Sequence, residues 1–312
     1  MDRDARIYVA GHLGLVGSAV MRRLASGGYA NLLTRSIDEL DLTRQADVEA
    51  FFARQKPEYV ILAAAKVGGI HANNTLPADF IRINLQIEMN VIDAAFRNNV
   101  KKLLFLGSSC IYPRHAPQPM KEEHLLTGPL EPTNAAYALA KISGLMMCES
   151  YNRQHGTNFI GAMPTNLYGP NDNFDLDASH VIPAMMRKFH EAKVAGRSEV
   201  ELWGTGSPLR EFLHVDDLAD ALVFLLDRFD AAPGKLFVNV GVGHDISIRD
   251  VAELIRGTVG FTGRIRWNTA MPDGTPRKLL DVSRIADLGW KARTTLEEGI
   301  STTYQWYVEN RA

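Results

Sequence analysis

The sequence is short of cysteine, of excess charge and of long apolar segments. Its only two cysteines, Cys110 and Cys148, argue against a disulfide framework and leave no spacing for a zinc site. The formal net charge of -2 gives no basic surplus for a nucleic-acid backbone, although a small anionic ligand remains possible. No apolar run approaches the roughly 20 residues of a membrane span, and the charged start MDRDARIYVAG lacks the apolar core of a secretory signal. We therefore expect a cytoplasmic protein with neither a nucleic-acid nor a membrane partner.

Apolar strands alternate with helical segments through the first half of the chain. Strands are predicted at Arg6–Ala10, 31–34, Glu58–Ala65 and Lys101–Gly107, and helices follow them, including Asp47–Gln55 and Pro77–Asn99. This alternation predicts an α/β fold of the Rossmann type, in which a doubly wound parallel sheet is covered by helices on both faces.

A chain of 312 residues is longer than one typical domain. The turn-rich segment PTNLYGPND marks a break, so we expect a dinucleotide-binding domain over residues 1–170. Residues 171–312 are then a smaller mixed α/β lobe that binds the substrate. Two later segments, DDLADALVFLL and FVNV, are expected to return to the first sheet.

A glycine-rich turn follows the first strand. Gly11, Gly14 and Gly17 have the spacing GxxGxxG, which allows a sharp turn, close approach of a pyrophosphate and tight packing of helix on strand. Arg35 follows the second strand, where an acidic side chain would bind the ribose of NAD. Because a guanidinium pairs well with a 2'-phosphate, Arg35 predicts NADP(H) as the cofactor.

The segment YALAK places Tyr137 and Lys141 one helical turn apart on the same face. A lysine cation can lower the pKa of a nearby phenol and make it useful in proton transfer, although this spacing more often means a ring packed on a lysine stem. The upstream segment GSSCIY places hydroxyls and a thiol where a strand should end. Ser108 or Ser109, with Tyr137 and Lys141, resembles the catalytic set of the extended short-chain dehydrogenases that act on nucleotide sugars.

Six longer segments narrow this resemblance. GSSCIYP, NAAYALAKISGLMMCESYN, PTNLYGPND, SHVIPAMMRKFHEA, LREFLHVDDLA and GTPRKLLDVSRI together resemble the GDP-L-fucose synthase family, and the likeness covers nearly the whole chain. The resemblance implies epimerisation of a GDP-4-keto-6-deoxy-D-mannose at carbons 3 and 5, then reduction at carbon 4 by NADPH. It assigns Cys110 as base and His180 as acid in the epimerisation. In the reduction Tyr137 protonates the carbonyl oxygen, Ser108 donates a hydrogen bond to it, and Lys141 lowers the tyrosine pKa and binds the nicotinamide ribose.

The resemblance also implies the residues around each ligand. Those expected at the cofactor are Gly11, Gly14, Leu15, Val16, Gly17, Arg35, Asp41, Leu42, Ala63, Ala64, Lys66, Lys141, Pro164, Asn166, Leu167 and His180. Those expected at the substrate are Ser109, Asn166, Arg187, Trp203, Arg210 and Lys278. An arginine suits a diphosphate, and a tryptophan can flank a base or a sugar. The chain departs from the family at His12, where an arginine is frequent, and this removes a cation near the 2'-phosphate.

Other functions stay open at this point. A redox-neutral nucleotide-sugar epimerase or dehydratase would usually use NAD and an acidic residue near Arg35, and a related reductase would make another GDP-deoxyhexose. A non-catalytic dinucleotide-binding regulator would typically have lost Tyr137 or Lys141, and both are present. The helices Pro77–Asn99 and Ala135–Gly156 resemble those of a two-fold four-helix interface, so we expect a homodimer.

Overall fold

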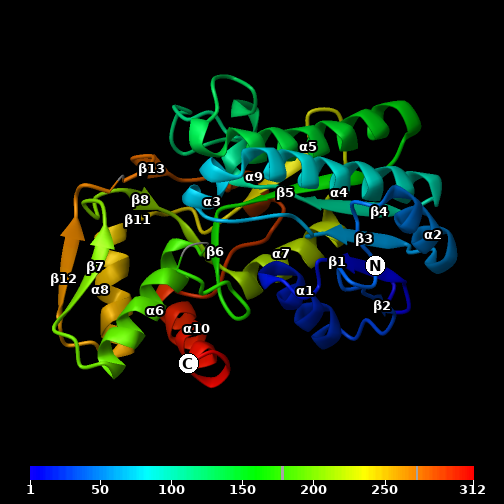
Figure 1. Cartoon of the computed structure of the whole chain (residues 1–312). Helices are drawn as coiled ribbons and strands as arrows, with labels where there is room; N and C mark the ends of the chain where they lie inside the picture. Colours follow the sequence, from blue (N-terminus) through cyan, green and yellow to red (C-terminus); the bar gives the residue numbers. More distant parts are fainter. Residues whose placement is uncertain (177–178, 272) are drawn as a thin grey trace.

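Six parallel strands form the centre of the molecule (Figure 1). The structure is a computed structural model that describes residues 1–176, 179–271 and 273–312. The strands lie in the order β2, β1, β3, β4, β5, β10, and every neighbouring pair is parallel. Their bounds are β1 Ile7–Ala10, β2 Leu32–Leu33, β3 Tyr59–Leu62, β4 Lys102–Leu106, β5 Phe159–Pro164 and β10 Phe237–Val240. The predicted Rossmann-type sheet is confirmed, with strands somewhat shorter than expected.

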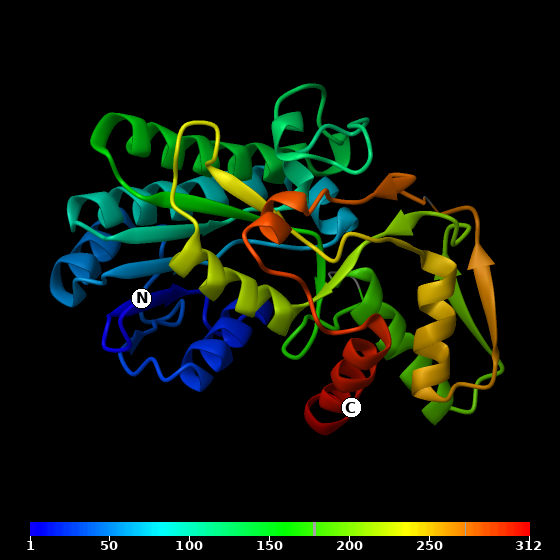
Figure 2. The same ribbon diagram turned by 180° about the vertical axis from the view of Figure 1, so that it is seen from behind.

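Helices cover both faces of this sheet, as Figures 1 and 2 show. One face carries α2 (Gln45–Gln55), α4 (Pro77–Arg97) and α5 (Ala135–His155), whose apolar side chains join one core cluster. The other face carries α1 (Leu15–Ser26) and α7 (Val215–Arg228), which contribute to a second cluster. Because apolar side chains meet the sheet from both sides, β1, β4 and β5 are buried at every position.

The chain leaves the first sheet after β5 and returns to it for α7 and β10. β10 pairs with β5 at the sheet edge, as predicted for the segment FVNV. The helix α7 packs beside α1 beneath the sheet (Figure 1). This return ties the later part of the chain to the lobe that holds the glycine turn.

The remaining elements form a smaller lobe around a third core cluster. Its helices are α6 (Val181–Val194), α8 (Ile248–Val259) and α10 (Leu296–Asn310), and its small sheets pair β7 (Glu199–Trp203) with β12 (Arg264–Asn268), β6 (Asn166–Tyr168) with β9 (Phe212–His214), and β8 (Leu209–Arg210) with β11 (Ile246–Ser247) and β13 (Arg277–Lys278). Short helices complete the chain at α3 (Ile70–Thr75), α9 (Ser283–Asp287), η1 (Ser109–Ile111), η2 (Glu122–His124) and η3 (Pro132–Asn134). No helix of the described residues has the length and apolar character needed to cross a bilayer.

Residues 209–214 carry two short strands, β8 and β9, which belong to different sheets and are separated by Glu211. The carboxylate of Glu211 is fully buried and accepts hydrogen bonds from the backbone N–H groups of Val242, Gly243 and Leu280. A buried carboxylate that needs these donors interrupts the strand pattern, because no single sheet edge supplies them.

Candidate active site

The glycine turn between β1 and α1 is built for close approach of a ligand. Gly11 has a φ of 85°, and a Cβ on it would lie 2.8 Å from the Ala64 nitrogen. A Cβ on Gly17 would lie 2.0 Å from the Gly11 oxygen, so both positions exclude a side chain. A Cβ on Gly14 would meet only the Gly11 oxygen, at 3.5 Å, so packing does not require glycine there. Gly14 is the N-cap of α1, where bare backbone suits a pyrophosphate on the helix N-terminus.

A cavity of about 640 Å³ connects this turn to the smaller lobe. Its lining includes Gly14 and Leu15 from the glycine turn and the start of α1, Asp172 and His180 from the segment before α6, and Arg187 from α6 itself. The cavity therefore brings together residues predicted for the cofactor and for the substrate.

Most other predicted cofactor residues lie where the sheet strands end. Arg35 follows β2, with its guanidinium carbon 5.6 Å from the centre of the Phe51 ring. Arg35 also donates a hydrogen bond of 2.6 Å to the Thr34 carbonyl. The carboxylate of Asp41 accepts hydrogen bonds from Thr43, which orders the following loop at Leu42.

The next strand ends carry the rest of this set. Ala63 and Ala64 follow β3, and the Lys66 backbone N–H donates to the side chain of Asn84 at 2.8 Å. Pro164 ends β5, and Asn166 and Leu167 begin β6. Ligands of parallel sheets bind beyond the carboxyl ends of the strands, and this placement agrees with that rule.

Ser108, Cys110 and Tyr137 meet at η1, directly after β4. The Ser108 hydroxyl accepts a hydrogen bond from the Cys110 backbone N–H at 3.3 Å, and the Ser108 side chain acts to lower the pKa of the Tyr137 phenol. The Cys110 sulfur accepts from the Asn134 side chain at 3.3 Å and from the Lys278 ammonium at 3.5 Å. The predicted reduction residues and the predicted base are thus in one place.

Lys278 also connects this group to His180. Burial and the charge of Lys278 both lower the pKa of the His180 imidazole. His180 is the N-cap of α6, lines the cavity and is partly exposed to solvent there. One ammonium therefore acts on the sulfur of Cys110 and on the ring of His180, the predicted base and acid.

The comparisons with known proteins agree with this arrangement. Residues 7–241 match the NAD dependent epimerase/dehydratase family. The chain belongs to this family. It is 62% identical to GDP-L-fucose synthase 1 of Arabidopsis thaliana, covering 99% of this chain and 95% of the relative. It is 53% identical to GDP-L-fucose synthase of Escherichia coli K12, covering 98% of this chain and 97% of the relative.

A solved structure extends the likeness to the fold. The GDP-L-fucose synthetase from Naegleria fowleri bound to NADP superposes with a TM-score of 0.91 at 29% identity, over 99% of this chain and 96% of that one. Together with the curated relatives, this match confirms the resemblance predicted from the six sequence segments. In this epimerase/dehydratase, the glycine turn and η1 lie at the same edge of the sheet.

Lys141 of this family member has a partner that the sequence did not reveal. Its ammonium lies 3.2 Å from a carboxylate oxygen of Glu88 on α4 and donates 3.0 Å to the Leu106 carbonyl. Burial, Cys110 and Glu88 together raise the pKa of Tyr137, and only the Ser108 hydrogen bond opposes them. This direction is opposite to the one expected from Lys141, because burial is the largest cause and the charges of Cys110 and Glu88 add to it. Glu88 lies among the buried positions Asn84, Ile87 and Val91 of α4, and no local pattern in the sequence marked it as buried.

The predicted substrate residues are spread more widely. Lys278 of β13 is paired in register with Arg210 of β8, so these two cations are neighbours. Arg187 lines the cavity and is paired with Glu191 at 2.7 Å. Trp203 is 53% exposed at the end of β7, beneath the Lys188 ammonium. Ser109 is buried within η1.

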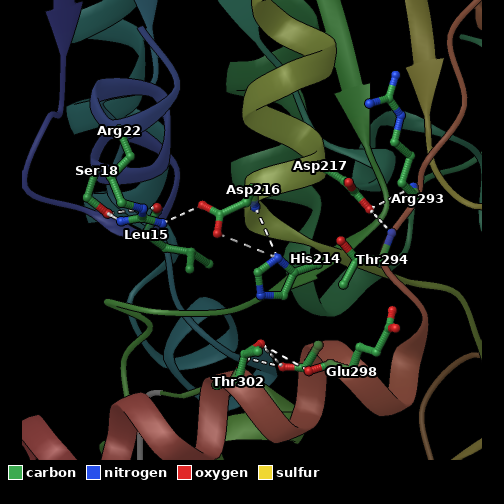
Figure 3. A network of polar contacts seen from close by, with 12 residues as sticks. Leu15, Ser18, Arg22, His214, Asp216, Asp217, Arg293, Thr294, Glu298 and Thr302 are labelled. Carbon is green, nitrogen blue, oxygen red and sulfur yellow. Dashed lines mark hydrogen bonds and ion pairs between the residues drawn. The ribbon is translucent and has the colours of Figure 1, made fainter. Parts of the chain in front are cut away.

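A polar network holds the cofactor helix α1 against the rest of the molecule (Figure 3). Arg22 of α1 pairs with Asp216 of α7 at 2.6 Å, and the Asp216 backbone N–H donates to the buried His214 ring. The next residue, Asp217, accepts from the backbone N–H groups of Arg293 and Thr294, which lead into α10. His214 has a structural place in this network, because its buried ring accepts the Asp216 backbone N–H.

Proposed function

We propose that this chain is an NADPH-dependent epimerase/reductase that converts GDP-4-keto-6-deoxy-D-mannose into GDP-L-fucose. The names of the similar proteins and the NADP-bound neighbour support this proposal. The observation that carries it is the position of Lys278, which contacts the Cys110 sulfur and acts on His180 beside the Tyr137 site. An epimerase that inverts only carbon 4, by removing and returning a hydride, needs no such thiol and imidazole pair.

In the epimerisation step, Cys110 acts as base and His180 as acid. The ketone at carbon 4 acidifies the hydrogens on carbons 3 and 5, so a thiolate can remove each as a proton. The Lys278 ammonium, 3.5 Å away, stabilises negative charge on the Cys110 sulfur. His180 returns a proton to the opposite face, and its lowered pKa makes the protonated ring a readier donor.

In the reduction step, Ser108 and Tyr137 act on the carbonyl oxygen. Bound NADPH would supply the hydride to carbon 4, held by the glycine turn and by Arg35 at its 2'-phosphate. The Ser108 hydroxyl donates a hydrogen bond to the oxygen while the Tyr137 phenol delivers the proton. The Lys141 ammonium lies 5.9 Å from the centre of the Tyr137 ring and would bind the nicotinamide ribose.

We further propose that the protein is a homodimer through α4 and α5. These helices pack side by side on one face of the sheet and carry Met89 and Leu139, which are 55% and 45% exposed. A second copy related by a two-fold axis would cover these side chains in a four-helix interface.

The test is to supply the purified protein with GDP-4-keto-6-deoxy-D-mannose and NADPH in deuterated water. We expect stoichiometric loss of the NADPH absorbance and a product that NMR identifies as GDP-L-fucose, with deuterium at carbons 3 and 5. No loss of NADPH would favour a redox-neutral epimerase or dehydratase. Deuterium at fewer carbons would favour a reductase that makes another GDP-deoxyhexose.

A further inference from the structure

Glu88 is a buried acid in direct contact with the catalytic lysine. It lies on the sheet-facing side of α4 and is 1% exposed, while Lys141 on α5 is 2% exposed. One carboxylate oxygen of Glu88 lies 3.2 Å from the Lys141 ammonium. Among the described residues, Lys141 is the only cation in ion-pair contact with Glu88. A buried pair of this kind is costly to form, and removing one partner leaves the other charge uncompensated.

The facing side of α5 is shaped to admit this carboxylate. A Cβ on Gly144 would lie 2.7 Å from Glu88 Oε2 and 2.7 Å from the Phe105 ring, so glycine provides the space. Lys141, Gly144 and Cys148 follow at helical spacing and turn toward α4. The titratable groups that Glu88 influences are therefore Lys141, Tyr137 and Cys148, all on α5.

The charge of Glu88 acts against that of Lys141. Burial raises the pKa of Glu88 to about 6, with Lys141 opposing the rise, so the carboxyl is ionised at neutral pH. Burial is the largest cause of the raised pKa of Tyr137, and the charges of Cys110 and of the Glu88 carboxylate add to it, whereas an unpaired lysine cation would lower this pKa. The Lys141 ammonium lies 5.9 Å from the Tyr137 ring centre, close enough for its charge to matter if it were not offset.

We propose that Glu88 is a positioning residue that holds the Lys141 ammonium and offsets its charge, so that Tyr137 stays protonated as the proton donor for ketone reduction. This inference rests on the proposed function, because a reductase needs a phenol and an enzyme that oxidises an alcohol needs a phenolate. Glu88 would thus increase the share of the enzyme in which Tyr137 carries the proton that it donates.

The test compares Glu88→Gln with the parent and with Glu122→Gln. Glu122 is also a buried carboxyl beside a cation, Arg284 at 3.7 Å, but it lies on η2. Tyrosine labelled with ¹³C at Cζ reports each phenol by NMR without turnover, and Tyr137→Phe assigns the signal. In Glu88→Gln we expect Tyr137 to titrate at least about one pH unit lower than in the parent. The alkaline limit of the NADPH oxidation rate should move by the same amount, and Glu122→Gln should move neither.

Glu88→Asp supplies a second variant that keeps the charge, and it should restore the parent titration in part. A Tyr137 titration unchanged in Glu88→Gln, with a rate lowered equally at every pH, would show a structural role only and overturn the proposal. Absence of any Tyr137 titration in Glu88→Gln below the pH of unfolding would also count against it. The NMR measurement needs no sugar, so a shifted titration in a protein that fails to reduce the substrate would refute the proposed function and leave the role of Glu88 intact.

Discussion

The Lys278 side chain contacts the proposed base, Cys110, and its charge acts on the proposed acid, His180. Lys278→Met keeps the length of the side chain and removes the charge beside the Cys110 sulfur. We expect deuterium incorporation at carbons 3 and 5 to slow by about 100-fold, since stabilisation of the thiolate is lost. Reduction of the ketone should persist and give a product that is not epimerised.

A matched control for this variant lies next to it in the same strand. Arg277 is also in β13, but its side chain pairs with Asp245 at 2.5 Å and away from Cys110. Arg277→Met should leave deuterium incorporation within about twofold of the parent. If NMR shows the same rate of deuterium incorporation in Lys278→Met and Arg277→Met, Lys278 has no role in the epimerisation.

Asp172 lowers stability through a charge that the fold does not compensate. It is 6% exposed, one carboxylate oxygen has no hydrogen-bond partner, and burial raises its pKa to about 7. The folded form therefore binds more protons than the unfolded form between about pH 4 and pH 7, so this group lowers stability as pH rises through that range. Asp172→Asn should raise the free energy of unfolding by roughly 1–3 kcal/mol at pH 8 and by almost nothing at pH 4. Urea unfolding at both pH values measures this, and an equal gain at both would contradict the assignment.

Glu211 acts at the level of elements, because it fixes the strand that carries Lys278. Its carboxylate accepts the Leu280 backbone N–H at 3.0 Å, two residues beyond Lys278. Glu211→Gln replaces an acceptor oxygen by an N–H₂ group that faces these donors, and we expect a loss of roughly 2–4 kcal/mol in unfolding free energy. Exposed Glu253 on α8, paired with Arg256, supplies the control. A Glu211→Gln protein that unfolds at the same urea concentration as Glu253→Gln would refute this role.

The elements that the sequence predicts are those defined by local patterns. The glycine turn, the strands β1, β3 and β4 and the helix bearing Tyr137 and Lys141 each follow from periodicity or from a short motif. Glu88 and Glu211 could not be predicted in the same way, because each depends on groups that the fold brings from other elements. A glutamate on an amphipathic helix normally faces water, and only the packing of α4 against α5 shows that Glu88 does not.

At the scale of the whole molecule, the chain's return through β10 makes the larger lobe depend on both halves of the sequence. The segment FVNV suggested this return because it is a short apolar run typical of a buried strand. The pairing of Lys278 with Arg210 had no such signal, since β8 and β13 are each two residues long. Short strands carry too few side chains for a period to be read.

The proposed dimer is the last property that belongs to the whole molecule. Met89→Arg combined with Leu139→Arg places two like charges on the exposed faces of α4 and α5, which a partner copy would bury. Because burying unpaired charge is costly, we expect the dimer dissociation constant to rise by at least about 100-fold. Val194, 74% exposed at the end of α6, provides the control Val194→Arg, which should leave the assembly unchanged. Sedimentation velocity distinguishes the outcomes: a parent protein that sediments as a monomer, or a doubly substituted protein that stays dimeric, places the interface elsewhere than on α4 and α5.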